Sequence, residues 1–389
     1  MILVCEPQCK GLEHVDFNAA VIAMVHYALT NEKIAFFAER EHLVSVRNRL
    51  TGFLIDNVSY HEIDVSSRID KKYKTVLYEL EICRRIFHYA RTNGINNVLF
   101  SSTTSVTLIA IKVLLCFCIN VKCITIPHSI LLTIRKWPKR WLFGIPFWFK
   151  TALLFKNPDR LRYLVIGGFT KEWLKLQLPT IEKKLLSVEM PYLFKRKDYN
   201  MINDERQTIR FGFFGFGSID KGIELFIKLS EDIQRTHTRM IPEFVLIGNT
   251  YKTEPEMNFG CVYMPSPYKP LSTDDYERYA KSIDYSIILY NPETYNIIHG
   301  ASIMDSFEYC KPIIAIRSVL VELYFKEMDD IGYLCSNYEE LIKAIVSILN
   351  EFPTERYNRQ CNNILKRREN LSPHKISTSL KKEITNFWL

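Results

Sequence analysis

Short apolar runs rich in β-branched residues alternate with longer amphipathic stretches along most of the chain. Apolar residues at helical spacing separate the short runs, so the pattern predicts strands and helices in turn. In the first half, strands are predicted at residues 2–5, 34–37, 60–65, 97–101, 122–127 and 163–167. Helices are predicted at residues 15–29, 41–50, 73–92 and 104–116. This alternation is typical of βαβ units, in which helices cover both faces of a parallel sheet.

A polar, charged stretch over residues 193–208 lacks apolar periodicity and is predicted to be a linker. A second alternating series follows it. Its predicted strands are residues 210–214, 243–247, 260–264, 285–289, 312–316 and 332–335. Its predicted helices are residues 223–235, 273–281, 302–309 and 338–351, followed by 355–369 and 372–387.

The length of 389 residues favours two domains, because one hydrophobic core seldom organises so long a chain. We predict an α/β protein with two Rossmann-like doubly wound domains, at residues 1–195 and 209–370. A helix within 371–389 is expected to pack back on the first domain. Open α/β folds bind ligands at the carboxyl ends of their strands, so a cleft facing both sheets is the expected site. Periplasmic binding proteins, epimerases and phosphorylases share this architecture, which therefore names no function by itself.

Cysteine usage favours a reduced, cytoplasmic protein. The ten cysteines are scattered, and the first residues lack the basic and apolar regions of a secretory signal. The pairs Cys5/Cys9 and Cys116/Cys118 have no partner pair at zinc-site spacing, so buried thiols are the better interpretation. The adjacent acids at 274–275 are interpreted as a helix start after Ser272, so we expect no metal and no cofactor.

No segment of the sequence is predicted to cross a membrane. The longest apolar tract, residues 106–126, is interrupted by Lys112 and Lys122. A spanning helix needs about 20 predominantly apolar residues. The tract is better interpreted as a helix followed by a strand.

The second domain opens with a glycine-containing turn that follows a predicted strand. Gly215 and Gly217 precede Lys221 and Gly222 at the start of a helix. Glycines let a ligand approach the backbone closely, and a helix N-terminus with a lysine favours a diphosphate. The alternative is a structural turn with a solvated lysine.

A second polar loop lies farther along this domain. His299 and Gly300 precede a helix that carries Asp305 and Glu308. Free N–H groups near Gly300, Ala301 and Ser302 are expected to receive a diphosphate, and Asp305 or Glu308 to bind ribose hydroxyls. The alternative is an ordinary capped helix with solvated acids.

These two runs resemble the donor-binding signature of the GT-B glycosyltransferases, especially the family-4-like group. The run CKPIIA at residues 310–315 is similar to the family's G-x-P-V-I-A type ending, and the turn from Gly215 to Gly222 resembles its Gly-to-Lys-Gly turn. Residues 6–7 and 13–18 are similar to the acceptor-side loop of related polysaccharide enzymes. The resemblance implies a nucleotide-sugar donor on the second domain and an acceptor on the first.

The sequence departs from the family pattern at two places. The family's acidic pair has seven residues between its members, which would put Ile297 opposite Asp305, with Glu293 as the nearest substitute. Phe216 stands where the family has an arginine before the lysine. The negative charge of the leaving diphosphate would then be neutralised by Lys221, unless Lys269, Arg317 or Arg210 contributes. Whether the anomeric configuration is retained or inverted stays open.

Candidate catalytic residues in the first domain follow its predicted strands. His128 comes just after the strand at 122–127, and in similar enzymes a histidine there contacts the transferred sugar. Its alternative role is to satisfy nearby backbone. Glu13, His14 and Asp16 occupy the first turn of a helix, where they are candidate bases toward an acceptor hydroxyl. Acids there also complement the helix dipole.

A basic and aromatic segment spans residues 135–150. Tryptophan prefers the membrane interface, and cations attract anionic lipid, so we expect peripheral contact with the inner face of a membrane. Nucleic-acid stacking and an interdomain contact are the alternatives, and no RNA-binding signature accompanies the segment. The expected membrane residues are Lys136, Trp137, Lys139, Arg140, Trp141, Phe147 and Trp148.

Together these features predict a glycosyltransferase that moves a sugar from a nucleotide diphosphate to an oligosaccharide or lipid-linked acceptor. Positive charge at Lys221 and the helix dipole would stabilise the departing diphosphate. A nucleotide-sugar epimerase and a non-catalytic nucleotide- or carbohydrate-binding protein remain alternatives. The sequence does not name the sugar, the base, the acceptor, the linkage or the oligomeric state.

Overall fold

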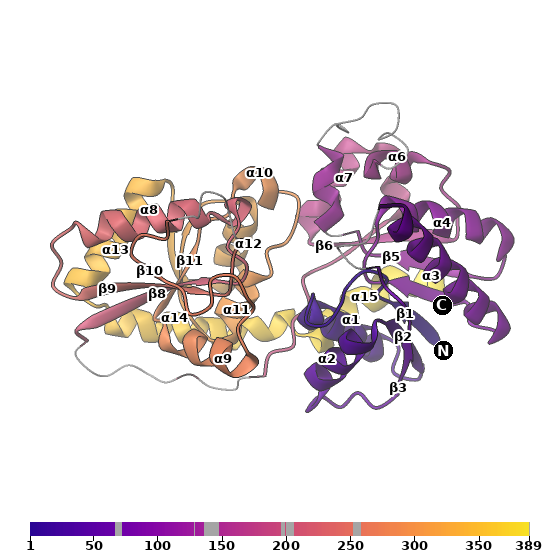
Figure 1. Ribbon diagram of the computed structural model, residues 1–389, viewed down its shortest axis with the longest axis horizontal. Helices are drawn as coiled ribbons and strands as arrows, with labels where there is room; N and C mark the ends of the chain where they lie inside the picture. Colours follow the sequence, from indigo (N-terminus) through magenta and orange to yellow (C-terminus); the bar gives the residue numbers. More distant parts are fainter. Residues whose placement is uncertain are drawn as a thin grey trace. The chain divides into compact units, whose positions relative to one another are not determined.

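The computed structural model describes residues 1–66, 72–127, 129–135, 148–195, 199, 206–251 and 258–388. They form two compact units (Figure 1). The first comprises Met1–Leu193, Ile297–His299 and Asn370–Leu389, and the second comprises Phe194–Asn296 and Gly300–Glu369. Each unit contains one sheet in which every pairing is parallel.

The first sheet has seven strands in the order β3-β2-β1-β4-β5-β6-β7. Its strands are β1 (Ile2–Cys5), β2 (Ile34–Ala38), β3 (Val58–Glu62), β4 (Asn97–Phe100), β5 (Lys122–Thr125), β6 (Leu161–Ile166) and β7 (Leu185–Val188). In the register, Val4 of β1 lies between Phe36 of β2 and Leu99 of β4. The central strands are buried on both faces, which explains their unbroken apolar runs.

Two layers of helices cover the first sheet. These are α1 (Val15–Ala28), α2 (Arg40–Leu50), α3 (Lys72–Thr92), α4 (Ser105–Phe117), η1 (Ser129–Ile134), α6 (Phe149–Leu154), α7 (Gly168–Gln177), η3 (Pro179–Lys184) and α15 (Pro373–Trp388). From β1 the chain passes through β2 to β3, at one edge of the sheet. It then crosses back to β4, on the other side of β1, and continues through β5 and β6 to β7 at the opposite edge. Right-handed crossovers therefore put α1 and α2 on one face, and α3, α4, α6 and α7 on the other. Helix α15 packs closely against α1.

The second sheet has six strands in the order β10-β9-β8-β11-β12-β13. Its strands are β8 (Thr208–Phe214), β9 (Ile241–Ile247), β10 (Val262–Tyr263), β11 (Tyr285–Ile288), β12 (Ile313–Ile316) and β13 (Gly332–Cys335). Its helices are η4 (Ile219–Lys221), α8 (Ile223–Gln234), α9 (Thr273–Ser282), α10 (Pro292–Tyr295), α11 (Ser302–Glu308), α12 (Val319–Met328), α13 (Tyr338–Asn350) and α14 (Thr354–Arg367), followed by η5 (Arg368–Leu371). Side chains of Ser272, Ser318 and Asn337 cap α9, α12 and α13.

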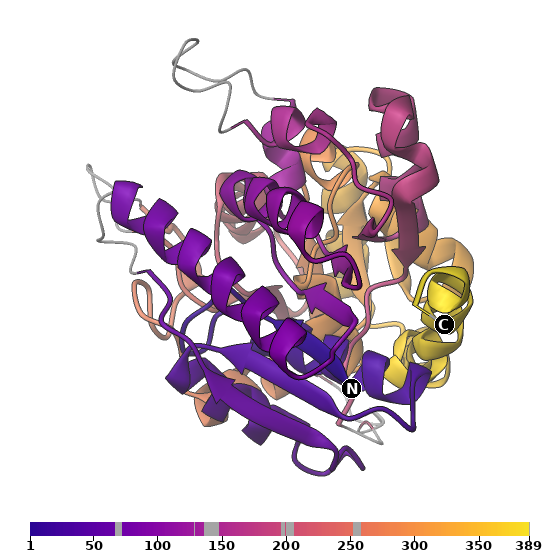
Figure 2. The same ribbon diagram turned by 90° about the vertical axis from the view of Figure 1, so that its right-hand side faces the viewer.

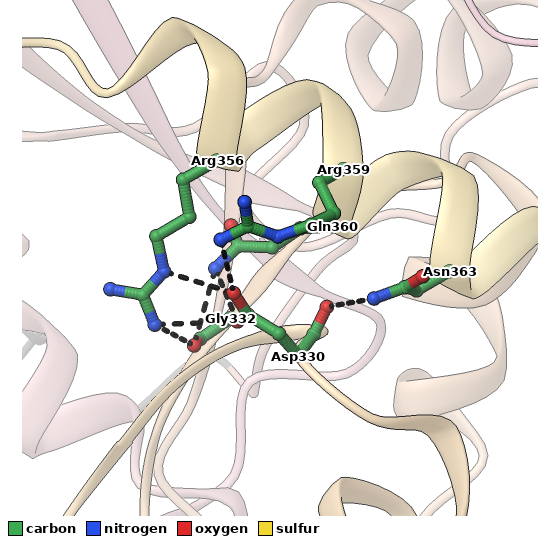
Figure 3. A network of polar contacts seen from close by, with 6 residues as sticks. All are labelled: Asp330, Gly332, Arg356, Arg359, Gln360 and Asn363. Carbon is green, nitrogen blue, oxygen red and sulfur yellow. Dashed lines mark hydrogen bonds and ion pairs between the residues drawn. The ribbon is translucent and has the colours of Figure 1, made fainter.

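A polar network holds α14 to the start of β13 (Figure 3). The Asp330 carboxylate accepts hydrogen bonds from Gln360 Nε2 at 2.8 Å and from Arg356 Nε at 3.1 Å. The Asp330 carbonyl accepts from Asn363 Nδ2 at 3.0 Å. Partial burial would raise the pKa of Asp330, but the bonds from Arg356 and Gln360 outweigh burial and lower it. This network fixes the amino end of an edge strand, away from the carboxyl ends where ligands bind.

The predicted fold class, two doubly wound α/β sheets, is confirmed. One predicted strand is displaced: the structure has β3 at Val58–Glu62, earlier than residues 60–65. Five elements of the first unit were not predicted: η1, α6, α7, η3 and the edge strand β7. Strand β7 contains only four residues, LLSV, and follows a 3-10 helix directly, so it has too little pattern to stand out.

Candidate functional site

The second sheet reverses its strand order between β8 and β11, and the loops after these two strands form the candidate donor site. Such a switch point is where open α/β sheets bind ligands. The two loops are joined because Asn291 N donates to Asp220 O at 2.9 Å and Thr294 Oγ1 donates to Asp220 Oδ1 at 3.0 Å. The predicted donor glycines therefore lie at the edge of the sheet where a ligand is expected.

The loop after β8 depends on glycine at two positions. Gly215 has φ 80° and Gly222 has φ 87°, both in the left-handed region that side chains disfavour. A Cβ on Gly222 would also collide with the carbonyl oxygen of Leu289, at the end of β11. The neighbouring loop is equally tight, since a Cβ on Gly248 would collide with the carbonyl oxygen of Gly215. Backbone thus packs on backbone, and the turn at Gly215–Gly217 is fixed.

Lys221 is half-buried beside this turn. A Cβ on Gly215 would lie 3.1 Å from Lys221 Nζ, so the ammonium lies next to the glycine backbone. Burial lowers the pKa of Lys221, and the charge of Asp305 acts in the opposite direction. A partly desolvated cation beside the partly buried backbone of Gly215 is suited to an anionic ligand.

Asp305 approaches the same turn from α11. Its Oδ2 accepts a hydrogen bond from the Tyr276 hydroxyl of α9 at 2.9 Å. The start of α11 is fixed by Tyr290, whose hydroxyl lies 2.6 Å from Ser302 Oγ. A Cβ on Gly300 would collide with the Tyr290 ring, so a larger residue at position 300 would displace this contact. The structure therefore brings Lys221 and Asp305 together, with Gly300 and Ser302 packed around Tyr290 and Ala301 exposed.

Glu308 has a different environment from Asp305. It is buried, and its two carboxylate oxygens accept from Lys195 N at 3.1 and 3.2 Å. At the same end of α11, the buried Arg368 guanidinium donates to the carbonyls of Phe307 and Glu308 at 2.8 and 2.7 Å. These bonds hold the C-terminus of α11 and engage the Glu308 carboxylate, whereas Asp305 lies near Lys221.

His299 packs in the first unit, together with Ile297 and Ile298. Its Nε2 lies 3.8 Å from Glu189 Oε2, and its ring lies 5.5 Å from that of Phe169. Burial would raise the pKa of Glu189, but His299 and the Gly168 amide outweigh burial and lower it. Sequence reasoning missed Glu189, which directly follows β7. The sequence feature that could have indicated Glu189 is an acid directly after a strand, but that strand, β7, was not predicted.

The first sheet has its own switch point between β1 and β4. Glu6 follows β1 and is fully buried. Its Oε1 accepts from Gln8 N at 2.9 Å and from the Ser102 hydroxyl, while Oε2 accepts from Ser101 Oγ at 3.0 Å. Burial would raise the pKa of Glu6, but the bonds from Ser102 and Gln8 N outweigh burial and lower it.

Asn18 of α1 extends this network. Its Nδ2 donates to Glu6 Oε2 at 3.2 Å and lies 3.0 Å from His42 Nε2. His42 Nδ1 lies 3.0 Å from the Gly11 carbonyl, so the His42 ring links α2 to the loop before α1. We call Glu6, Asn18, His42, Ser101 and Ser102 the Glu6 network. Sequence analysis singled out Glu6 and Asn18 but missed the other three. The hydroxyl-rich run SSTTS after β4 was the available signal.

The three candidate bases at the start of α1 have different surroundings. Asp16 forms an ion pair with Arg49, whose guanidinium also donates to Leu193 O at 2.7 Å. Glu13 Oε2 accepts from Lys10 N at 3.3 Å. His14 is exposed and has φ 52°, a left-handed conformation uncommon outside glycine. The geometry thus gives Asp16 a structural partner and leaves the His14 ring at the surface.

Several predicted site residues lie outside the described residues: His128, Lys136, Trp137, Lys139, Arg140, Trp141 and Phe147. Trp148 is described, and its Nε1 donates to Thr133 O at 2.7 Å. Among the described residues, no helix combines the length and hydrophobicity needed to cross a membrane. The same residues contain no group of three or more His, Cys, Asp or Glu side chains arranged to hold a metal ion.

Comparison with known proteins gives similarity at the level of the fold. No protein-family model matches the sequence, and no curated protein matches it either. The solved structures do match. HepE from Anabaena in complex with UDP and glucose has a TM-score of 0.63 at 11% identity, over 99% of this chain and 100% of that chain.

Two further solved structures agree with this result. The catalytic domain of starch synthase IV from Arabidopsis thaliana, bound to ADP and acarbose, has a TM-score of 0.68 at 11% identity, over 99% of this chain and 98% of that chain. The lipopolysaccharide outer core galactosyltransferase WaaB has a TM-score of 0.65 at 9% identity, over 99% of each chain. These neighbours are GT-B glycosyltransferases, so the predicted GT-B fold is confirmed, and the family-4-like part of the resemblance stays a prediction.

Proposed function

We propose that this protein transfers a sugar from a nucleotide-diphosphate donor to a glycan acceptor. The observation that carries the proposal is the position of Lys221 beside the Gly215 turn, with Asp305 close to it, at the switch point of the second sheet. A diphosphate at this turn would neutralise the half-buried ammonium. The ribose hydroxyls of the same nucleotide would lie within reach of Asp305 on α11.

Catalysis in this proposal is electrostatic. As the glycosidic bond breaks, negative charge grows on the leaving diphosphate, and a fixed cation beside it lowers the barrier. Lys221 supplies this charge. Because Phe216 replaces the arginine of the family pattern, Lys221 bears more of the compensation than in a site with two cations. The mechanism requires no divalent cation.

The acceptor would be bound by the first unit. The Glu6 network fixes the backbone of residues 8–11 and the start of α1, so it would position Glu13 and His14. If the reaction inverts the anomeric centre, Glu13 or His14 would be the base, because Asp16 is engaged by Arg49. His128 would contact the transferred sugar, as the resemblance implies.

We further propose a lipid-linked acceptor and work at the inner face of a membrane. The support is the aromatic and basic composition of residues 135–150, which suits an interface with anionic lipid. Two of the similar structures were solved with UDP and ADP, so these nucleotides are the first to test.

The test is a thermal-shift screen against UDP, ADP, GDP, CMP, dTDP and their sugar conjugates. A ligand that binds only the folded state raises the melting temperature. The proposal expects one nucleoside diphosphate to stabilise the protein, and Lys221→Ala to abolish the shift. Lys228→Ala is the matched control, because Lys228 lies on α8 in an exposed pair with Asp232. If no nucleotide raises the melting temperature at millimolar concentration, the donor site is wrong.

A non-catalytic nucleotide-binding protein is the second candidate, and Phe216 in place of the family arginine favours it. Such a protein would show the same thermal shift and the same loss in Lys221→Ala. It would differ in turnover, because incubation with the stabilising nucleotide sugar and a pool of acceptors would release no nucleoside diphosphate. An epimerase would convert the donor sugar without any acceptor.

A further inference from the structure

Exposed large apolar side chains are unevenly distributed over the helices. They gather on α3, α4, α6 and α7, which form one of the two helical layers of the first unit. Among the α-helices that the structure describes, those outside this layer expose only Val44 and Val319. A concentration of apolar side chains on one face marks a surface that another body covers.

Helix α3 carries an exposed apolar stripe over its first turns. Tyr73, Leu77 and Leu80 are 59%, 60% and 43% exposed. Their spacing of four and three residues puts them on one face of the helix. In Figure 2, α3 is the long purple helix that runs across the near side of the first unit.

Helix α4 packs against α3 and has no exposed charge. Its one charged residue, Lys112, is buried and donates to Ala152 O at 2.5 Å, to Leu153 O at 3.1 Å and to Phe155 O. The outward positions are apolar and include Val113 and Phe117. A surface helix normally has a polar outer face, and one that is apolar all round is covered in its working state.

Helix α6 continues the same surface. Leu154 and Phe155, at its end, are both exposed. Lys112 bonds to this end from α4, and Arg160 donates to Leu115 O at 2.6 Å and to Cys118 O. These bonds join the end of α6 and the loop after it to the last turns of α4. We call Tyr73, Leu77, Leu80, Val113, Phe117, Leu154 and Phe155 the α3–α4–α6 face.

Exposed cations border this face, together with the exposed acids Glu62 and Asp64 before α3. Exposed cations include Lys74, Arg85 and Arg91 of α3 and Lys156 after α6. The exposed acid of α3, Glu81, forms an ion pair with Arg84, and Asp159 beside Lys156 forms one with Lys184. An apolar centre with cations on its rim complements a surface that is apolar inside and anionic at its boundary.

We propose that the α3–α4–α6 face docks on the surface of a lipid bilayer with anionic headgroups. Aromatic and aliphatic side chains would enter the boundary between headgroups and acyl chains, and the rim cations would contact the headgroups. A second copy of this chain fits less well, because a two-fold dimer would bring two basic rims together. The surface deepens the proposed function, since it would hold the enzyme beside a lipid-linked acceptor.

The experiment is co-sedimentation of the full chain with phosphatidylcholine vesicles, with and without phosphatidylglycerol. Binding is expected only with the anionic lipid and should weaken as salt rises. Leu77→Ser combined with Phe117→Ser should reduce the vesicle partition coefficient by about tenfold or more, because two large apolar side chains would no longer enter the bilayer. Val44→Ser combined with Leu54→Ser, exposed apolar positions outside the face, should leave binding unchanged.

Lipid binding and donor binding are read out separately. The nucleotide thermal shift should survive in every one of these variants, so its absence in the unmodified protein would count against the proposed function alone. Leu154→Ser, tested by itself, checks α6 independently of α3 and α4. Vesicle binding that is equal in the face variants and the control variants would overturn the proposal. A dimer in sedimentation velocity that Leu77→Ser with Phe117→Ser dissociates, with lipid binding intact, would instead assign the face to a second copy.

Discussion

Each sheet reverses its strand order beside its first strand. The charged residues that follow these two strands differ in the sign of their charge and in how many hydrogen bonds they form. After β1, Glu6 is a buried anion that accepts hydrogen bonds from backbone and neutral side chains. After β8, Lys221 is a half-buried cation beside bare glycine backbone. A carboxylate that accepts this many hydrogen bonds belongs to the scaffold of the fold. The Lys221 ammonium, whose pKa is lowered by burial, would be stabilised by a bound anionic ligand. The comparison separates a switch point that shapes a loop from one that we propose binds a ligand.

Glu6→Gln should have the largest effect and should act on stability. The amide would place a donor among groups that already donate, which leaves buried polar atoms unsatisfied in the whole Glu6 network. We expect a loss of about 3 kcal/mol or more in the free energy of unfolding, measured by urea titration. Glu13→Gln, a partly exposed acid in the next loop, should stay within roughly 0.5 kcal/mol. Equal stability of the two variants would show that the network contributes nothing to the scaffold.

Lys221→Ala should produce the second largest effect and should act on binding. A hydrogen bond to a charged group contributes roughly 1.5–3 kcal/mol, so the dissociation constant of the stabilising nucleoside diphosphate should rise by about ten- to a hundredfold. Isothermal titration calorimetry measures it directly. The melting temperature without ligand should change little. A variant that unfolds easily but still binds normally would reverse the assignment of scaffold and ligand site.

Tyr276→Phe should have a smaller effect at the same site. The substitution removes the hydroxyl that donates to Asp305 and leaves the ring in place. Asp305 then loses one neutral hydrogen bond, which is worth about 1 kcal/mol, so affinity for the nucleotide should fall by roughly fivefold. The matched variant is Tyr279→Phe on the same helix, where the hydroxyl faces Tyr263 instead. A similar loss in both variants would mean that Asp305 has no special part in binding.

Affinity for the nucleotide should also depend on pH through Lys221. The bound diphosphate needs the ammonium form, and burial lowers the pKa of Lys221. Affinity should therefore fall as pH rises through this lowered pKa, before the ordinary lysine range near ~10.4. Lys221→Arg keeps its charge over that range and should bind with a flat pH profile. Calorimetric titrations of both proteins at increasing pH test this, and identical slopes would contradict it.

Chelation of divalent cations should have the smallest effect. If Lys221 carries the charge compensation, the rate of donor turnover should be unchanged by EDTA and by added magnesium. A coupled assay for the released nucleoside diphosphate gives the rate. Stimulation by magnesium would mean that the cation shares the work attributed to Lys221.

The strands and the ligand-binding edge of each sheet followed from apolar periodicity, since buried parallel strands are apolar along their whole length. The turn at Gly215–Gly222 was also predicted, because glycines after a strand permit left-handed backbone, and its use as a donor site stays a prediction. Periodicity failed at β7, which is short and lies at the edge. Without β7, the position of Glu189 next to His299 could not be foreseen.

The sequence could not show which residues, distant along the chain, contact each predicted site residue. Asp16 was a candidate base by its place in the first turn of α1, and only the fold shows that Arg49 pairs with it. Glu308 was a candidate ribose ligand because it lies on the helix that follows Gly300, and only the fold shows that it accepts from Lys195 N. The local sequence pattern places a residue on a helix or strand, but it does not show which distant residue forms an ion pair or hydrogen bond with it.

The contact between Gly248 and Gly215, and that between Gly222 and Leu289, have a consequence for recognising relatives of this protein. At 9–12% identity, the structures that share the fold have replaced nearly every side chain. A position where one backbone touches another admits no such replacement, because any Cβ would collide. The spacing of these three glycines along the chain therefore makes a compact search pattern, and it should detect diverged homologues that whole-sequence comparison misses.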